Sequence, residues 1–415
     1  MVKWGARAEL PVELGTADKQ KSDTGAVMMQ YRRFGKTALK MPVLTCGGMR
    51  FQHGWREDGE IPEESNRNVE ACLRRALELG MNHIETARGY GTSEYQIGRV
   101  LPSVKRDAYL LQTKVAPNKD VKQFVDTFDR SMKLLQVDYL DLFSFHGINT
   151  EDCLEATMLC LDQALQWKKE GRIRHIGFST HGPTEIIIKA IETDAFEYVN
   201  LHWYYIFQDN WPAILEATRR DMGVFIISPN DKAGMLYQPS EKLLNLCKPL
   251  HPMVFNGLFC LSRPEVHTLS IGVARPEDFD IHMETVAKLD QAQTLITPII
   301  ARLEATMLET VGAEWFRTWH VGLPQHETPG EFNIPWILRL RNLALAYDMT
   351  EFGKMRYNLL GNGGHWFPGN QAKDVLKYDL SKCLRNSPHA DKIPALLAEA
   401  HAMFSGAPVK RLQQD

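Results

Sequence analysis

The stretch His83–Ile97, His-Ile-Glu-Thr-Ala-Arg-Gly-Tyr-Gly-Thr-Ser-Glu-Tyr-Gln-Ile, joins an apolar strand tip to a Gly-Tyr-Gly turn and the start of a helix. It therefore places Tyr90 on a short loop just beyond the carboxyl end of a strand, which is where an α/β barrel carries its chemistry. Thr92 or Ser93 can cap the following helix, with Gln96 as the capping-box partner of Ser93. We expect a rigid turn that holds Tyr90 in a fixed place.

Strand-like and helix-like segments alternate on both sides of this stretch. Short apolar runs with strand character lie at 43–46, 83–86, 109–114, 139–145, 173–178, 198–202, 224–227 and 268–273. Segments with helical periodicity lie between them, at 65–79, 121–135, 151–169, 184–193, 211–220 and 276–289. A short hairpin is expected before the first strand, over 30–42. Strands that alternate with helices in this way predict a parallel sheet closed into a (β/α)8 barrel.

A doubly wound open sheet is the alternative fold. Such a sheet normally opens with a glycine-rich turn that leads directly from a strand into a helix. In this chain Thr45-Cys-Gly-Gly-Met49 is followed by Arg50-Phe-Gln-His-Gly-Trp55, which is not a helix start. The dinucleotide-binding fingerprint is missing, and the barrel is the predicted fold.

The two ends of the chain differ in pattern from the barrel. A chain of 415 residues exceeds one ordinary hydrophobic core. Residues 1–28 are polar and unpatterned, and we expect them to form a flexible N-terminal extension. The barrel domain is predicted over 29–289. Residues 290–415 are predicted to form a mostly helical C-terminal domain, with helices over 291–311 and 334–345 and a glycine-rich loop over 356–369.

The composition is that of an ordinary globular protein, with 44% hydrophobic and 24% charged residues. A net charge of -3 gives no electrostatic reason to expect a nucleic-acid partner. No apolar run approaches the roughly 20 residues needed to span a bilayer, and the N-terminus has no signal-peptide core. We therefore expect a cytoplasmic protein that acts on a small molecule, with no membrane partner.

Polar side chains end three successive predicted strands. The second strand ends at Glu85 and leads to Tyr90, the third ends at Lys114, and the fourth ends at His146. Each residue alone is easily explained as structural, because a lysine at a strand end is often solvated and a histidine or tyrosine often packs. Since neighbouring strand ends lie about 5 Å apart, however, all four can meet at one rim of the barrel. Their shared position favours a catalytic role.

The chemistry of such a group is proton transfer to a carbonyl. A tyrosine with an ordinary pKa of about 10 is a weak acid, and an adjacent ammonium such as that of Lys114 is expected to lower the pKa of Tyr90. Glu85 would balance the lysine charge, and His146 would orient a carbonyl oxygen. No side chain supplies hydride, so the pattern implies a nicotinamide cofactor.

These motifs resemble those of the aldo-keto reductase family. Ile84–Glu94 is similar to the signature Asp-Thr-Ala-x-x-Tyr-Gly-x-Ser-Glu, and Gln112-Thr-Lys114, Phe145-His146, Gly177-Phe-Ser179 and the stretch 271–277 follow in the family's order. The resemblance covers roughly 30–290 and implies NAD(P)H-dependent reduction of an aldehyde or ketone, or the reverse oxidation. It gives Tyr90 the role of general acid/base, Lys114 that of lowering its pKa and His146 that of orienting the substrate.

One member of this set departs from the family. Glu85 stands where the family has aspartate, so its carboxylate extends one methylene, about 1.5 Å, further from the backbone. The alternative function is therefore a catalytically impaired protein that binds the nicotinamide cofactor in a regulatory or interaction role.

The resemblance also implies a set of residues around the cofactor. Those expected to contact the nicotinamide carboxamide are Ser179 and Asn200, the latter in place of the family's usual glutamine. The pyrophosphate would meet Ser228 and Lys232, and the adenosine side would meet Gly272, Arg275 and His282. Arg275 can clamp a 2′-phosphate, which favours NADP, whereas Asp278 nearby would repel that phosphate and leaves NAD as the alternative.

Large aromatic residues on the loops are candidates for a substrate pocket that takes an apolar or sugar-like carbonyl compound; they are Phe51, Trp55, Trp203 and Tyr204. Aromatic residues at these places also cap barrels structurally.

The C-terminal domain resembles an extension that carries a four-cysteine iron-sulfur cluster in one branch of the family. Cys383 is the only cysteine after Cys260, and one thiolate cannot hold such a cluster, so we expect no iron-sulfur cluster and no metal.

Overall fold

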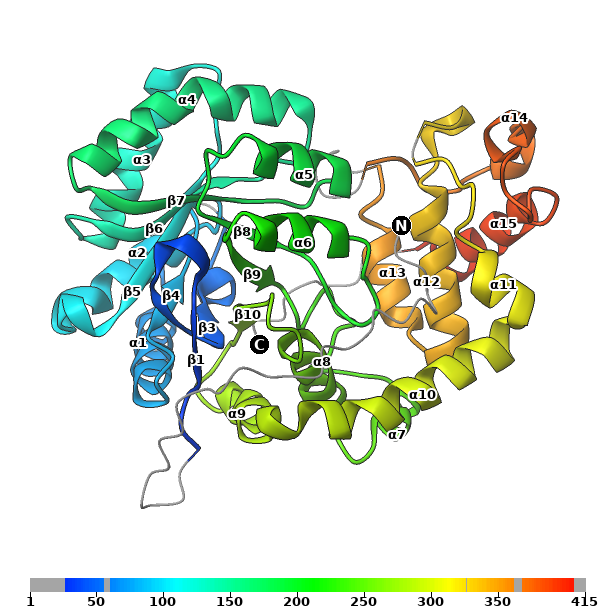
Figure 1. The fold of residues 1–415 in the computed structure, drawn as a ribbon, viewed down its shortest axis with the longest axis horizontal. Coiled ribbons are helices and arrows are strands. Elements are labelled where there is room, and N and C mark those ends of the chain that lie inside the picture. The colour runs from blue at the N-terminus through cyan, green and yellow to red at the C-terminus, as the bar shows by residue number, and fades with distance from the viewer. Residues whose placement is uncertain (1–26, 56–59, 326, 362–367, 407–415) are drawn as a thin grey trace. The chain divides into compact units, whose positions relative to one another are not determined.

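The computed structural model describes residues 27–55, 60–325, 327–361 and 368–406 (Figure 1). These residues form two compact units, one made of 27–233 with 256–292 and the other of 234–255 with 293–406. The predicted N-terminal extension, 1–28, lies almost wholly outside the described residues, as does most of the predicted glycine-rich loop, at 362–367.

The first unit contains the predicted barrel. Within the described residues eight parallel strands close on themselves in the order β10-β3-β4-β5-β6-β7-β8-β9. The strands are β3 (Leu44–Gly47), β4 (His83–Glu85), β5 (Leu110–Val115), β6 (Leu140–His146), β7 (Ile173–Ser179), β8 (Tyr198–Leu201), β9 (Gly223–Ile227) and β10 (Thr268–Gly272). Each predicted strand is present within one residue or so of its expected ends, and the (β/α)8 fold is confirmed.

Most of these strands are followed along the chain by a helix on the outside of the barrel (Figure 1). They are α1 (Glu63–Glu78), α2 (Ser93–Val100), α3 (Val121–Leu135), α4 (Glu151–Lys169), α5 (Thr184–Glu192), α6 (Trp211–Arg219) and α9 (Asp278–Lys288). All the predicted helices are confirmed. Helix α8 (Pro252–Leu261) was not predicted, because its sequence is apolar almost all round and shows no 3.6-residue period.

A hairpin closes the barrel at the amino ends of its strands. Strands β1 (Tyr31–Arg33) and β2 (Lys40–Pro42) pair antiparallel, as expected for 30–42. Between them Phe34 is fully buried against Tyr198 and Phe225, with ring centroids of Phe34 and Tyr198 5.6 Å apart. This packing fills the floor of the barrel, so the opposite rim, at the carboxyl ends, is left for the site.

The second unit is helical, as predicted. Its helices are α7 (Glu241–Cys247), α10 (Ala292–Val311), α11 (Ala313–Thr318), α12 (Ile334–Tyr347), α13 (Thr350–Tyr357), α14 (Ser381–Leu384) and α15 (Ile393–Phe404). The two helices expected at 291–311 and 334–345 are α10 and α12. Helix α13 runs to Tyr357 and so shortens the loop that was expected to begin at residue 356.

Residues 234–255 belong to this helical unit although the sequence analysis placed them in the barrel domain. The reason is visible in their hydrogen bonds, because Ser240 Oγ donates to Tyr347 O at 2.6 Å and Arg302 Nε donates to Leu246 O at 3.1 Å. The domain boundaries of the whole chain stay a prediction.

In the part of the chain that the structure describes, no helix is long and apolar enough to cross a membrane.

Helices α2 and α3 approach most closely at Gly98, and this contact yields a stability prediction. A Cβ atom at Gly98 would lie 1.9 Å from the Leu134 carbonyl oxygen. We expect Gly98→Ala to lower the free energy of unfolding by about 1–3 kcal/mol, since the backbone of α3 must shift. Urea unfolding measures the loss. Gly54→Ala, where the added Cβ has nothing within 4 Å, is the control and should change stability by less than about 0.5 kcal/mol; equal effects of the two would contradict the prediction.

Candidate active site

The four predicted catalytic residues lie at neighbouring strand ends of the carboxyl rim. Glu85 is the last residue of β4, Lys114 the penultimate residue of β5 and His146 the last residue of β6. Tyr90 lies on the loop between β4 and α2. The loop keeps the sheet pairing beyond the end of β4, because Thr86 N donates to the carbonyl of Gln112 on β5 at 2.9 Å.

The turn that carries Tyr90 is braced by side chains on both sides. Arg88 and the buried Glu94 form an ion pair of 2.7 Å across the turn. Gly91 has φ +54°, and a Cβ there would lie 2.0 Å from the Gly54 carbonyl oxygen, so only glycine fits. Thr113 Oγ1 donates to Glu94 at 2.6 Å and ties the turn to β5.

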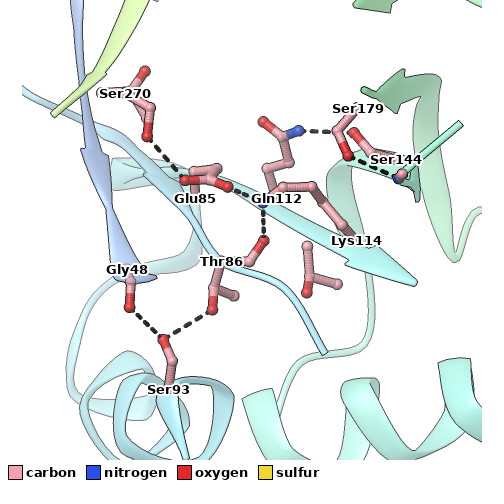
Figure 2. Close-up of polar contacts among 12 residues, drawn as sticks. Gly48, Glu85, Thr86, Ser93, Gln112, Lys114, Ser144, Ser179 and Ser270 are labelled. Atoms are coloured by element: carbon pink, nitrogen blue, oxygen red, sulfur yellow. Dashed lines mark hydrogen bonds and ion pairs between the residues drawn. The ribbon is translucent and has the colours of Figure 1, made fainter. Parts of the chain in front are cut away.

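The expected capping box at the start of α2 is wrong. Neither Thr92 nor Ser93 makes a side-chain cap hydrogen bond. Ser93 Oγ instead donates to Gly48 O at 2.8 Å and lies 2.9 Å from Thr86 Oγ1 (Figure 2). Thr92 Oγ1 bonds Gln96 Oε1 at 2.8 Å. The Ser93 hydroxyl is thus taken by partners outside the helix, and the Thr92 hydroxyl by a side chain one turn along it.

Glu85 and Lys114 form a buried ion pair. Lys114 Nζ contacts Glu85 Oε1 and donates to Thr86 O at 2.6 Å (Figure 2). The other carboxylate oxygen, Oε2, accepts a hydrogen bond of 3.0 Å from Ser270 Oγ. The side chains of Glu85 and Lys114 are 3% and 1% exposed. The longer carboxylate that replaces the family's aspartate thus still reaches the lysine.

Tyr90 lies against both Lys114 and His146. Lys114 Nζ is 4.6 Å from the centroid of the Tyr90 ring. The rings of Tyr90 and His146 meet edge to face, with centroids 5.8 Å apart and an interplanar angle of 87°. The structure therefore gathers the four predicted residues into one cluster, with the tyrosine half-buried at its outer side.

The electrostatics of this cluster correct one expectation. Burial raises the pKa of the Tyr90 hydroxyl above its ordinary value, and burial lowers the pKa of Lys114 well below its ordinary value. The sequence analysis expected Lys114 to lower the pKa of Tyr90. That expectation is not met in the protein alone, because the lysine is held by Glu85 and Thr86 O while burial disfavours the phenolate.

Two predicted cofactor residues lie beside the cluster. Ser179 ends β7 and faces Asn200 on β8 in the strand register, and His146 is its neighbour on the other side. Asn200 is fully buried, and neither its Oδ1 nor its Nδ2 has a hydrogen-bond partner among the described residues. A primary carboxamide offers one donor and one acceptor and would satisfy both atoms. These residues therefore fit a nicotinamide group.

Ser228 and Lys232 lie on the loop that follows β9. Ser228 adopts a left-handed conformation with φ +53°. Lys232 is buried, and its Nζ donates to His181 Nδ1 at 3.2 Å and to His202 Nε2 at 3.4 Å. The two histidines were not predicted. His181 lies two residues after Ser179, and His202 lies two residues after Asn200. Because alternate residues of a strand point to the same side, this spacing is the signal that could have identified them.

The residues predicted on the adenosine side differ in exposure. Gly272 ends β10, and its carbonyl accepts a long hydrogen bond of 3.4 Å from Asn230 Nδ2. Arg275 is 72% exposed, and its Nε lies 3.2 Å from Asp278 Oδ1. His282 is only 3% exposed and belongs to the buried face of α9, so it does not share the surface with Arg275.

The four predicted pocket aromatics likewise differ in burial. Trp203 is 2% exposed and stacks on Phe259 at a centroid distance of 4.9 Å, so it is a core residue. The Tyr204 hydroxyl contacts Ile227 O and His202 Nδ1 and is buried. Phe51 is buried, whereas Trp55 is 60% exposed next to Gly91. Of the four, only Trp55 presents its ring to solvent beside the Tyr90 turn.

The described residues contain no group of three or more histidine, cysteine, aspartate or glutamate side chains that could hold a metal ion. Cys260 is buried and Cys383 is half-buried, and both are free thiols. The absence of an iron-sulfur cluster stays a prediction.

Solved structures with this barrel fold include aldo-keto reductase AKR11C1 from Bacillus halodurans in its holo form. The likeness has a TM-score of 0.52 at 20% identity and covers 64% of this chain and 96% of that one. An aldo-keto reductase from Klebsiella pneumoniae in complex with NADPH gives a TM-score of 0.51 at 20% identity, covering 65% and 96%. These likenesses confirm the fold class, a (β/α)8 barrel.

The sequence comparison identifies the family. Residues 43–229 match the model of the aldo/keto reductase family, so this part of the chain is an aldo/keto reductase domain. L-glyceraldehyde 3-phosphate reductase of Escherichia coli K12 is 29% identical over 172 residues, which cover 37% of this chain and 46% of the relative. Methylglyoxal reductase DkgA of Salmonella typhimurium is 31% identical over 143 residues, covering 33% and 50%. The chain thus spans about half the length of these curated relatives.

Proposed function

We propose that the protein is an NAD(P)H-dependent oxidoreductase that reduces an aldehyde or ketone to an alcohol, or catalyses the reverse oxidation. The observation that carries the proposal is the cluster of Tyr90, Lys114, Glu85 and His146 at the carboxyl rim of the barrel. Two curated relatives are named as reductases of small aldehydes, which supports a small carbonyl compound as substrate.

The roles of the cluster follow from its chemistry. Bound nicotinamide supplies the hydride. As negative charge develops on the carbonyl oxygen, Tyr90 donates its phenolic proton to that oxygen. His146, whose ring borders Tyr90, orients the oxygen by hydrogen bonding, and Lys114 places a cation beside the tyrosine ring. Glu85 holds Lys114 in place.

The cofactor is assigned to the neighbouring sector of the rim. Asn200 and Ser179 would bind the carboxamide, since the Asn200 amide is buried and its polar atoms need partners. Lys232 and Ser228 would meet the pyrophosphate. Arg275 is the candidate for the 2′-phosphate, so NADP is the proposed cofactor; NAD remains the alternative because Asp278 already engages the guanidinium.

The test of this function is an assay of glyceraldehyde, glyceraldehyde 3-phosphate and methylglyoxal with NADPH and with NADH. Turnover is measured as the consumption of the reduced cofactor. We expect turnover of at least one aldehyde, faster with NADPH. Tight cofactor binding without turnover of any compound, extended to ketones and sugars, would instead favour the catalytically impaired alternative. The contact between Glu85 and Lys114 favours an active enzyme. It shows that the ion pair with the lysine is kept although glutamate stands where the family has aspartate.

The raised pKa of Tyr90 predicts different pH profiles for the two reaction directions. Reduction needs the protonated tyrosine, which persists up to and beyond the ordinary pKa of about 10. Oxidation needs the deprotonated tyrosine, which becomes more abundant at each step upward in pH. We therefore expect kcat/KM for reduction to stay level up to about pH 9 and kcat/KM for oxidation to rise throughout. A reduction rate that falls with a midpoint near neutral pH would show that either Tyr90 or Lys114, whose pKa burial lowers, loses its proton there.

A further inference from the structure

The Glu85 carboxylate has partners on both sides of its own strand, β4. Lys114 on β5 contacts Oε1, and Ser270 on β10 donates to Oε2 at 3.0 Å (Figure 2). Strand β10 is not a neighbour of β4, because β3 lies between them. The hydrogen bond from Ser270 therefore crosses an intervening strand in the barrel interior.

The crossing is possible because the intervening strand carries a glycine at this level. Gly47 of β3 is paired with Glu85 on one side and with Gly272 of β10 on the other. A Cβ at Gly47 would lie 2.5 Å from Ser270 Oγ and 3.4 Å from Glu85 Oε2. Any side chain there would occupy the space through which the two groups meet.

The length of the glutamate side chain allows this contact. An aspartate at position 85 would end about 1.5 Å short and its carboxylate would leave Ser270. A glutamate has one more rotatable bond, and a single partner at Oε1 would leave Oε2 buried without a donor, which is unfavourable. Ser270 supplies that donor and restricts the carboxylate to one orientation.

We propose that Ser270 is a positioning residue of the candidate active site, which holds the Glu85 carboxylate across Gly47 and through it fixes Lys114 beside Tyr90. The inference rests on the proposed function for its catalytic consequence only. The hydrogen bond stabilises the ionised carboxylate, and that charge in turn stabilises the Lys114 ammonium against the effect of burial. Ser270 itself touches neither Tyr90 nor the reacting atoms in this scheme.

The first test needs no catalysis. The protein is labelled with carbon-13 at the lysine ε position, and the signal of Lys114 is assigned by its loss in Lys114→Met. In Ser270→Ala we expect the midpoint of the Lys114 titration to fall by about one pH unit, equivalent to the tenfold effect of one charge-assisted hydrogen bond. Ser270→Thr keeps the hydroxyl and should keep the midpoint. Ser144→Ala removes an equally buried barrel hydroxyl, which bonds Gln112 and Tyr198, and should leave the midpoint unchanged.

The second test uses turnover of an aldehyde that the protein reduces in the assay with NADPH or NADH. Ser270→Ala should lower kcat about tenfold without changing the dissociation constant of the cofactor. In the Glu85→Asp background the same change should lower kcat less than about twofold, because the shorter carboxylate no longer meets Ser270. Equal effects in both backgrounds, or an unmoved Lys114 midpoint in Ser270→Ala, would overturn the proposal. If the wild-type protein turns over no substrate, the proposed function fails, and the titration still decides the role of Ser270.

Discussion

Replacement of Tyr90 by phenylalanine is expected to lower kcat by about 10²–10⁴-fold. The substitution removes only the hydroxyl that donates the proton. The ring keeps its contacts with Lys114 at 4.6 Å and with His146 at 5.8 Å, so the cluster should keep its shape. Steady-state kinetics give the loss of kcat, and cofactor fluorescence should show a dissociation constant that changes by less than about threefold.

The matched control is Tyr95→Phe. This tyrosine lies on α2, five residues after Tyr90, and is 42% exposed, so the same chemical change is made outside the cluster. We expect its kcat to stay within about twofold of wild type, as for other surface substitutions. Retention of full kcat in Tyr90→Phe would assign the proton to another group and remove the central role given to this residue.

The second large effect concerns stability and activity together. Lys114→Met should lower the free energy of unfolding by about 3–5 kcal/mol, because it leaves the Glu85 carboxylate buried without a cation. It should also abolish most turnover, since the cation beside the Tyr90 ring is lost. Urea unfolding and steady-state kinetics on the same preparation measure the two losses.

A double variant separates these two consequences. Lys114→Met combined with Glu85→Gln removes both charges, so much of the stability should return while turnover stays low. Lys122→Met breaks an ion pair with Asp126 whose partners are 82% and 62% exposed, and it should cost less than about 1 kcal/mol. If Lys114→Met unfolds at the same urea concentration as wild type, Glu85 and Lys114 are not charged partners in the folded protein.

The barrel was predictable because each of its strands is a short apolar run and most of its helices have one apolar face. The hairpin and the helices α3 and α4 were predicted to the residue or nearly so. Helix α8 was missed for the opposite reason, since its apolar residues surround the helix and leave no period to detect.

The position of a residue along its strand was enough to predict which side chains lie together at the rim, whereas contacts that depend on packing were not predictable. Glu85, Lys114 and His146 were found because parallel strand ends share a rim. Ser270 was not found, because its contact with Glu85 depends on closure of the barrel across β3. The burial of Trp203 and the direction of the Tyr90 pKa shift were also beyond reach, since both depend on which neighbours exclude water.

The Phe34 hairpin at the floor has a consequence for engineering this chain. The floor contacts involve the amino ends of β8 and β9, whereas the candidate chemistry lies at the carboxyl ends. The rim at the amino ends of the strands thus contributes to the stability of the fold, and the rim at the carboxyl ends carries the proposed catalysis. Substitutions that raise the melting temperature can be sought around Phe34 without disturbing the reaction. Variants with altered substrate specificity can then be made at the carboxyl rim of the stabilised protein.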